Sequence, residues 1–319
     1  MYYTRYRFLV AASAATAAVL LVAGLAFGST AKADPVAADP FAPVKAHITL
    51  PFHLINGYLL IEGNVNGFPG KFMFDTGTPF ALLLNNHYVP LTKDSFLSKG
   101  SATSGQSLTL YTQNVVKSVT ICDQAPFIGL TSVPHSDLGF VEEGICARYL
   151  GFIGHGFNKS YLFIIDYDSQ IIDLYSLSEK HDALKTRLGK DRIVSVLHFT
   201  SRDAAVVPEV ELSAGKQAII GRFDTGSQGV LRLTESVKVA LEKSGCLSVT
   251  KTPYQYGACA PRTICSLGGL RYKNQRLSDV HGLTLEIGDR NELTCGYQFL
   301  KNYVTAWNYG SKTITLLTK

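Results

Sequence analysis

The stretch KFMFDTGT at residues 71–78 returns with the same pattern as IGRFDTGS at residues 220–227. Each copy places Phe before Asp-Thr-Gly, has a hydroxyl residue after it, and follows a strand-like run, at 58–65 and at 206–212. A single Asp-Thr-Gly is weak evidence, because Asp and Gly are common turn residues and the tripeptide occurs by chance about once in a few thousand positions. Two matched copies indicate a duplicated chain.

A second matched pair follows downstream. GHGFNKSY at 154–161 and GYQFLKNY at 296–303 align without a gap and share Gly, Phe, Lys and Tyr. These two segments lie 142 residues apart, whereas the two Asp-Thr-Gly copies lie 149 residues apart. The halves are therefore colinear, and the second is shorter by 149 − 142 = 7 residues in its middle.

The pattern along the chain is dominated by strands. Short runs rich in β-branched and aromatic residues recur between Gly, Asn, Asp and Pro, and helical patterns are confined to 178–188 and 234–243. Together with the duplication, this predicts an all-β protein of two lobes. We expect an N-terminal lobe over 46–190 and a C-terminal lobe over 191–319.

The N-terminal region predicts export. Residues 1–33 combine a basic start, an apolar stretch at 8–27 and a small-x-small cleavage pattern at 31–33, as secretory signals do. The alternative is a retained membrane anchor, because about twenty apolar residues can span a bilayer. Residues 34–45 are rich in Pro and Ala and predict a linker. The body is therefore expected to be periplasmic or secreted, with membrane contact only through an uncleaved anchor.

Composition excludes several classes of function. The 319 residues are 46% hydrophobic and 17% charged, which suits a globular protein. Three positive charges of the formal +5 lie in the predicted signal, so 5 − 3 = 2 remain. No basic run alternates with aromatic residues, so a nucleic-acid partner is not expected. We expect a monomer without cofactor.

Six cysteines in an exported chain favour disulfides. Cys122 and Cys146 are the two in the first half and are expected to pair. The other four leave three pairings open: Cys246, Cys259, Cys265 and Cys295. Zinc is the rival interpretation, but neither a Cys-x-x-Cys pair nor a nearby His pair supports a metal site.

Asp75 and Asp224 are the candidate catalytic residues. Two carboxyl groups a few Å apart cannot both ionise, so such a pair holds one proton between them. The ionised member can take a proton from a bound water while the protonated member polarises a peptide carbonyl, and no covalent intermediate is needed. The neighbouring residues suit this task, with glycines for close approach and hydroxyl groups for hydrogen bonds: Thr76, Gly77, Thr78, Thr225, Gly226 and Ser227.

The sequence resembles the pepsin and retropepsin superfamily of aspartic proteases, and most of all its bacterial exported single-chain members. The resemblance rests on both Asp-Thr-Gly loops and both downstream Gly segments, over about residues 46–318. It implies a double β-barrel with an active-site cleft between the lobes. It also implies an endopeptidase that takes an extended protein or peptide substrate, with an envelope or periplasmic protein as the expected target.

The family pattern implies two further features. A hydrophobic-hydrophobic-Gly turn should pack over each loop; residues 152–154 match it, whereas Thr294-Cys295-Gly296 departs from it. A substrate-covering flap should lie within residues 98–121, where Tyr111 is a candidate but unassigned aromatic residue.

Retroviral members carry Ala where this chain has Thr78 and Ser227. A hydroxyl that donates to the ionised carboxylate lowers its pKa, so we expect activity to lean acidic. Two other classes remain open. A non-catalytic relative could keep the fold to bind peptide, although such proteins usually lose an Asp or the adjacent Gly. An envelope structural or adhesion module has only the Tyr content and the strand pattern in its favour.

Overall fold

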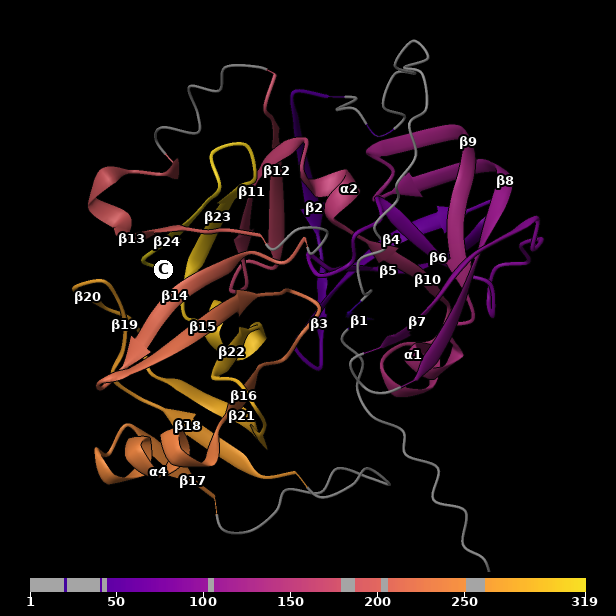
Figure 1. The fold of residues 1–319 in the computed structure, drawn as a ribbon. Helices are drawn as coiled ribbons and strands as arrows, with labels where there is room; N and C mark the ends of the chain where they lie inside the picture. The colour runs from indigo at the N-terminus through magenta and orange to yellow at the C-terminus, as the bar shows by residue number, and fades with distance from the viewer. Residues whose placement is uncertain are drawn as a thin grey trace, which may run out of the picture.

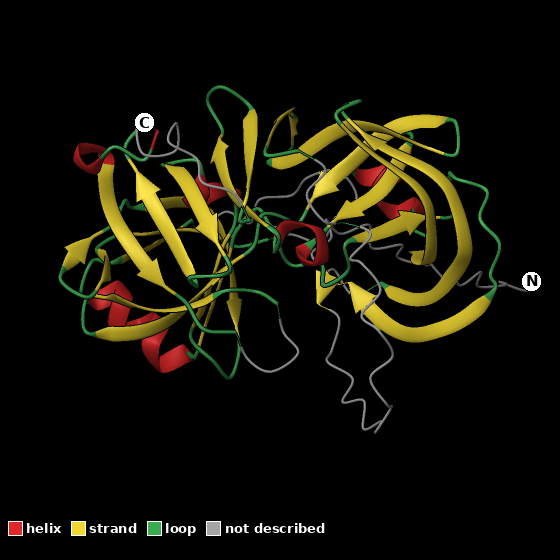
Figure 2. Ribbon diagram, turned by 90° about the horizontal axis from the view of Figure 1, so that it is seen from above, coloured by secondary structure: helices red, strands yellow, loops and turns green. Residues whose placement is uncertain are grey.

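The computed structural model in Figure 1 describes residues 20–21, 41, 45–102, 106–178, 187–201, 206–250 and 262–319. Its strands form two nine-stranded sheets and one six-stranded sheet. Figure 2 shows one β body on each side of a central seam. The predicted all-β architecture of two lobes is confirmed.

The first nine-stranded sheet is built from the N-terminal half. Within it β10 runs parallel to β5 and antiparallel to β6, which places Ile153 beside Phe74 and Leu82. In spatial order its strands are β1 (Leu20–Leu21), β7 (Ser95–Ala102), β8 (Ser107–Ile121), β9 (Ala125–Ser136), β6 (Leu82–Asn85), β10 (Tyr149–Ile153), β5 (Phe68–Phe74), β4 (Tyr58–Val65) and β3 (His53–Ile55).

The second nine-stranded sheet repeats this arrangement in the C-terminal half. Here β22 runs parallel to β15 and antiparallel to β16, so Cys295 lies beside Phe223. In spatial order its strands are β17 (Leu247–Val249), β18 (Ile264–Leu267), β21 (Val280–Ile287), β16 (Val230–Leu233), β22 (Glu292–Cys295), β15 (Gln217–Phe223), β14 (Glu209–Ala214), β19 (Leu270–Tyr272) and β20 (Gln275–Arg276).

The six-stranded sheet joins the halves, because each half contributes three strands. Its centre is the antiparallel pair β11–β23, in which Phe163 lies opposite Trp307 with ring centroids 5.6 Å apart. In spatial order its strands are β13 (Ile193–His198), β24 (Thr313–Leu317), β23 (Val304–Asn308), β11 (Tyr161–Asp166), β12 (Ile171–Ser176) and β2 (His47–Pro51).

Aromatic side chains connect this sheet to the two Asp-Thr-Gly loops. Phe74, directly before the first Asp, packs edge-on against Phe163 at 5.4 Å, and Phe223, before the second, packs against Trp307 at 6.2 Å. All four side chains are fully buried. Large buried aromatic rings contribute much of the apolar area that stabilises a core, so both loops start from a fixed aromatic base.

Helices are short and few among the described residues: α1 (Gly139–Gly144), α2 (His155–Asn158), the 3-10 turn η1 (Lys190–Arg192), α4 (Glu235–Lys243) and α5 (Tyr297–Leu300). The helix predicted at 234–243 is confirmed, with Thr234 accepting from the Val237 amide as its N-cap. The helix predicted at 178–188 falls largely outside the described residues. So do the predicted signal and linker, apart from residues 20–21, 41 and 45.

Within the described ranges, no helix has both the length and the apolar character needed to cross a bilayer.

The disulfide prediction is wrong for the five cysteines that the structure describes, because all five are free; Cys259 lies outside the described residues. Cys122 sits on the tight β8–β9 turn, packs against the main core and directs its thiol at the Pro51 carbonyl, 3.7 Å away. Cys146 packs instead against a separate apolar cluster beside α1. Burial raises the pKa of both thiols to about 11. Lying in the same half of the chain did not place them side by side.

Candidate active site

The two Asp-Thr-Gly loops leave the sheets in the same way. The Asp75 amide donates to the Ile153 carbonyl at 2.9 Å, and the Asp224 amide donates to the Cys295 carbonyl at 3.3 Å. Each hydrogen bond continues a parallel pair of strands by one residue beyond the last ladder position. Each aspartate is therefore fixed at the end of a buried strand.

A glycine turn packs over each loop. A Cβ atom on Gly154 would lie 2.4 Å from the Thr78 carbonyl oxygen, and one on Gly296 would lie 2.1 Å from the Ser227 carbonyl oxygen. Real Cβ atoms do not approach so closely, so only glycine fits at both positions. The departure noted at Thr294-Cys295-Gly296 therefore leaves the turn intact, with the buried Cys295 in the place that an aliphatic residue takes in the first copy.

Threonine side chains connect the two loops across the seam. The Thr76 amide donates to the Thr225 hydroxyl at 3.0 Å, and the Thr225 amide donates to the Thr76 hydroxyl at 3.1 Å. The Thr225 hydroxyl also donates to the Phe74 carbonyl at 2.8 Å. Both threonines are fully buried, so these bonds replace water for groups that could not otherwise be satisfied. They hold the loops in a single relative position.

The glycines of the motif let the carboxyl groups meet. A Cβ atom on Gly77 would lie 2.8 Å from both Asp224 carboxyl oxygens, and one on Gly226 would lie 2.4 Å from Asp75 Oδ1. Each carboxyl group thus rests against the glycine of the opposite loop. The two carboxyl groups are within hydrogen-bonding range of each other, and only 1% of Asp75 and 3% of Asp224 is exposed.

The hydrogen bonds to the two carboxyl groups are unequal. Asp75 accepts from the Gly77 amide and from the Thr78 hydroxyl, each at 2.8 Å. Asp224 accepts from the Gly226 amide at 2.9 Å. The buried Ser227 hydroxyl, equivalent to that of Thr78, has no partner among the described residues. Asp75 therefore receives more hydrogen bonds that stabilise a negative charge than Asp224 does.

This inequality separates the two pKa values. Burial raises the pKa of both carboxyl groups, because it disfavours the charged form. The charge of Asp75 and a hydrogen bond to it raise the pKa of Asp224 further. The Thr78 hydroxyl, the Asp224 hydrogen bond and backbone amides pull the pKa of Asp75 back down. The pKa of Asp224 is therefore raised further above its usual value than the pKa of Asp75.

Tyrosines around the pair form a part of the site that the sequence patterns did not identify. Burial raises the pKa of Tyr58 and Tyr149, and the charge of Asp75 adds to both. The buried hydroxyl groups of Tyr149 and Tyr309 have no partner among the described residues. The 16 tyrosines of the chain carry no motif that would have singled out these three.

The predicted flap region, 98–121, falls on the β7–β8 hairpin, whose tip at 103–105 is outside the described residues. Tyr111 contacts Phe96 across the hairpin, with ring centroids 6.4 Å apart. Its ring stacks on His135 with centroids 6.0 Å apart, and Lys93 Nζ lies 5.0 Å above its centroid. These contacts place the Tyr111 ring among Phe96, His135 and Lys93.

In the ranges that the structure describes, no group of three or more His, Cys, Asp or Glu residues is arranged to hold a metal ion.

Comparison with known proteins establishes the fold. No protein-family model matches the chain, and no curated protein matches it. Among solved structures 382 chains match, including basic 7S globulin from soybean, with a TM-score of 0.51 and 11% identity over 86% of this chain and 95% of the globulin. The chain therefore has a two-lobed, all-β fold of the pepsin type.

The predicted place among bacterial exported single-chain aspartic proteases is wrong. The similar structure named above is a globulin from soybean, and neither a family model nor a curated relative supports that group. The prediction rested on short loop motifs. At 11% identity, such motifs indicate the fold but do not identify one group of proteins among those that share it.

Proposed function

We propose that the chain is an endopeptidase that hydrolyses peptide bonds with a water molecule activated between Asp75 and Asp224. One observation carries this proposal. Two buried carboxyl groups, one from each half, meet at the seam with unequal hydrogen bonds, so that one proton is shared between them. A pair whose environments separate its pKa values is suited to act as acid and base together.

The proposed reaction starts with the proton on Asp224. The Asp75 carboxylate takes a proton from the water, whose oxygen attacks the peptide carbonyl carbon, while Asp224 gives its proton to the carbonyl oxygen. The resulting diol collapses as a proton passes from Asp75 to the amide nitrogen. The C–N bond then breaks, and Asp224 recovers a proton from the diol. Thr78 stabilises Asp75 each time it is ionised.

The side chains next to the pair favour an apolar substrate. An apolar cluster on the N-terminal side of the site contains Met73, two residues before Asp75, together with Tyr58, Tyr149 and Phe152. These side chains are 0–2% exposed, so an extended peptide must first displace what covers them before its own side chains can pack there, while its backbone makes strand-like hydrogen bonds. We therefore expect cleavage next to apolar or aromatic residues. Export of the chain, and an envelope target, stay predictions from the N-terminal sequence.

A non-catalytic peptide-binding module is the second candidate, and one observation favours it. Both carboxyl groups are almost completely covered, so water and substrate must first displace other groups. A binding protein with the same fold would have no need to admit water to the pair.

Cleavage of a denatured protein over a pH series tests the proposal. We expect Asp75→Asn and Asp224→Asn each to lower kcat/KM by about 10²- to 10⁴-fold. The matched control is Asp166→Asn. It removes a carboxylate at the end of β11 that, in the described structure, accepts from the Asp168 and Ser169 amides, and it should leave cleavage unchanged. A statine-type peptide should bind tightly to the wild type. Peptide binding without cleavage at any pH would favour the binding module instead.

A further inference from the structure

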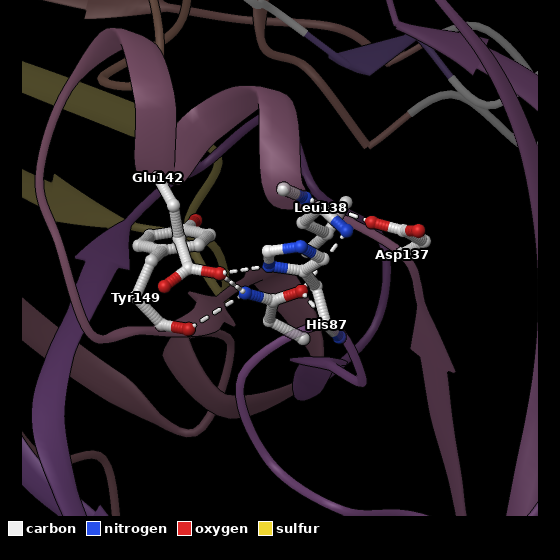
Figure 3. A network of polar contacts seen from close by, with 7 residues as sticks. His87, Asp137, Leu138, Glu142 and Tyr149 are labelled. Atoms are coloured by element: carbon white, nitrogen blue, oxygen red, sulfur yellow. Dashed lines mark hydrogen bonds and ion pairs between the residues drawn. The ribbon is translucent and has the colours of Figure 1, made fainter.

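A polar network ties α1 to β6 and β10 (Figure 3). At its centre is the Glu142 carboxylate of α1, whose side chain is 14% exposed. It accepts from His87 Nδ1 at 2.6 Å and from Asn85 Nδ2 at 3.1 Å. Asn85 ends β6 and His87 lies just beyond it, so the network joins a helix to the end of a strand.

Asn85 carries the network inward. It is fully buried and, besides Glu142, its amide group donates to the Tyr149 carbonyl at 2.9 Å. Its side-chain oxygen accepts from the Leu138 amide at 2.9 Å and from the His87 amide at 3.1 Å. All four hydrogen-bonding positions of this side chain are thus used, as a buried amide requires. Asn85 therefore fixes β6, β10 and the start of α1 to one another.

The same elements form the apolar wall beside Asp75. Val141 of α1 and the preceding Leu138 belong to the apolar cluster that includes Met73 and Tyr58. Tyr149 lies in that cluster and packs edge-on against Phe152 at 5.4 Å. These side chains are 0–2% exposed, so the position of α1 sets how this apolar wall packs beside Asp75.

Among the described residues, the charged groups that act most strongly on His87 are acidic. They are Glu142 and Glu143 of α1 and Asp137 just before it. The ring also packs on the start of α1, since a Cβ atom on Gly139 would lie 3.1 Å from it. The hydrogen bond to Glu142 raises the pKa of His87, and the side chain is 54% exposed. The solvent can therefore change its charge near neutral pH.

We propose that the His87–Glu142 pair is a pH-sensitive latch that holds α1, and with it the apolar wall beside Asp75, in place while His87 carries its second proton. A neutral His87 can still donate from Nδ1, but the mostly buried carboxylate then loses its positive partner. His87 is a positioning residue here, because it acts on the wall through Glu142 and Asn85. For its effect on cleavage, the latch rests on the proposed function.

The sign of the pH dependence follows from linkage. The pKa of His87 is higher in the folded protein than in the unfolded chain, so the folded state binds its proton more tightly. The stabilisation is complete below the unfolded value of about 6.5 and is lost as the pH rises through the raised pKa. We expect the wall to loosen over the same interval.

The test compares the same His→Gln substitution at two positions, one inside the proposed latch and one outside it, together with a substitution of Glu142. His87→Gln keeps a donor but removes the titration, and Glu142→Gln removes the acceptor charge. His53→Gln is the matched control, because His53 also pairs with a glutamate, Glu62 at 3.0 Å, on the same lobe, and neither residue belongs to the Glu142 network. Thermal unfolding, amide exchange of α1 and peptide cleavage are measured from pH 5 to 9.

The latch predicts that the Tm, the protection of α1 and 1/KM of the wild type fall together above about pH 6.5. The fall in 1/KM should be at most about fivefold, since one half-exposed ion pair is responsible. His87→Gln and Glu142→Gln should both lose this slope, and His53→Gln should keep it. A slope in α1 protection that survives in both variants would overturn the latch.

Failure of the proposed function gives a different result. If no variant cleaves peptide at any pH, the endopeptidase proposal fails, while the Tm and exchange profiles still decide on the latch. If His87 has only a structural role, His87→Gln should lower the Tm by the same amount at every pH and should leave the pH dependence of α1 protection unchanged. That outcome also counts against the latch.

Discussion

The two Asp-Thr-Gly loops share one backbone arrangement and differ in one hydroxyl contact. Thr78 donates to Asp75 at 2.8 Å, whereas the equivalent Ser227 hydroxyl, buried beside Asp224, has no partner in the described structure. Duplication alone would give two equal carboxyl groups. A single side-chain hydrogen bond lowers the pKa of Asp75, while burial and the charge of Asp75 raise the pKa of Asp224. Near-symmetry brings the groups together, and a local difference gives them different tasks.

The largest effect is expected where the loops touch. An added Cβ at Gly226 would lie 2.4 Å from Asp75 Oδ1, closer than the 2.8 Å between a Cβ at Gly77 and Asp224. Gly226→Ala should therefore lower the free energy of unfolding by about 3 kcal/mol, and Gly77→Ala by about 1–2 kcal/mol. Urea unfolding measures both. Gly144→Ala is the control, since a Cβ there meets nothing within 4 Å. Equal losses at all three positions would contradict the close approach.

Removing the two threonine hydroxyl groups should lower the free energy of unfolding by unequal amounts. Thr225→Val leaves the Thr76 amide and the Phe74 carbonyl unpaired, whereas Thr76→Val leaves only the Thr225 amide unpaired. At about 1–3 kcal/mol for each buried unpaired group, Thr225→Val should cost about 2–3 kcal/mol and Thr76→Val about half of that. Equilibrium unfolding of both single variants and of the double variant checks this order. If Thr76→Val proved the costlier change, the hydrogen-bond assignment would be wrong.

The smallest effect concerns pH. From the sequence, the hydroxyl groups of both Thr78 and Ser227 were expected to lower the pKa of the carboxyl groups. The structure restricts the expectation to Thr78, because Ser227 makes no such bond. Without the Thr78 hydroxyl the pKa of Asp75 rises, so the acid limb of kcat/KM should move up by about one pH unit. Ser227→Ala should leave it in place. A pH–rate profile of each variant measures the shift. An equal shift in both would contradict the unequal hydrogen bonding of the two aspartates.

The parts predictable from sequence are those set by local pattern and by repetition. The run at 58–65 is β4 to the residue, and the helix at 234–243 begins at its capping threonine. The residues of the duplicated motif meet as expected, because colinear halves place equivalent loops opposite each other. These features could be predicted because local sequence pattern and the duplication of the chain determine them.

Other features depend on packing between distant segments, and sequence patterns do not contain that information. Tyr58 and Tyr149 lie beside the aspartates because α1, β4 and β10 enclose one apolar cluster. Cys122 and Cys146 belong to different clusters of the same half, so counting cysteines by halves gave the wrong pairing. The Glu142 network joins residues 57 positions apart along the chain, with no motif to mark it.

The shared six-stranded sheet has a consequence for any attempt to divide the molecule. Cutting the chain between β12 and β13 would expose β11 on one fragment and β23 on the other, each with a row of unsatisfied amide and carbonyl groups. Open strand edges of this kind recruit whatever complementary strand is nearest. Fragments produced together would reassemble along that edge, whereas either one produced alone would self-associate through it.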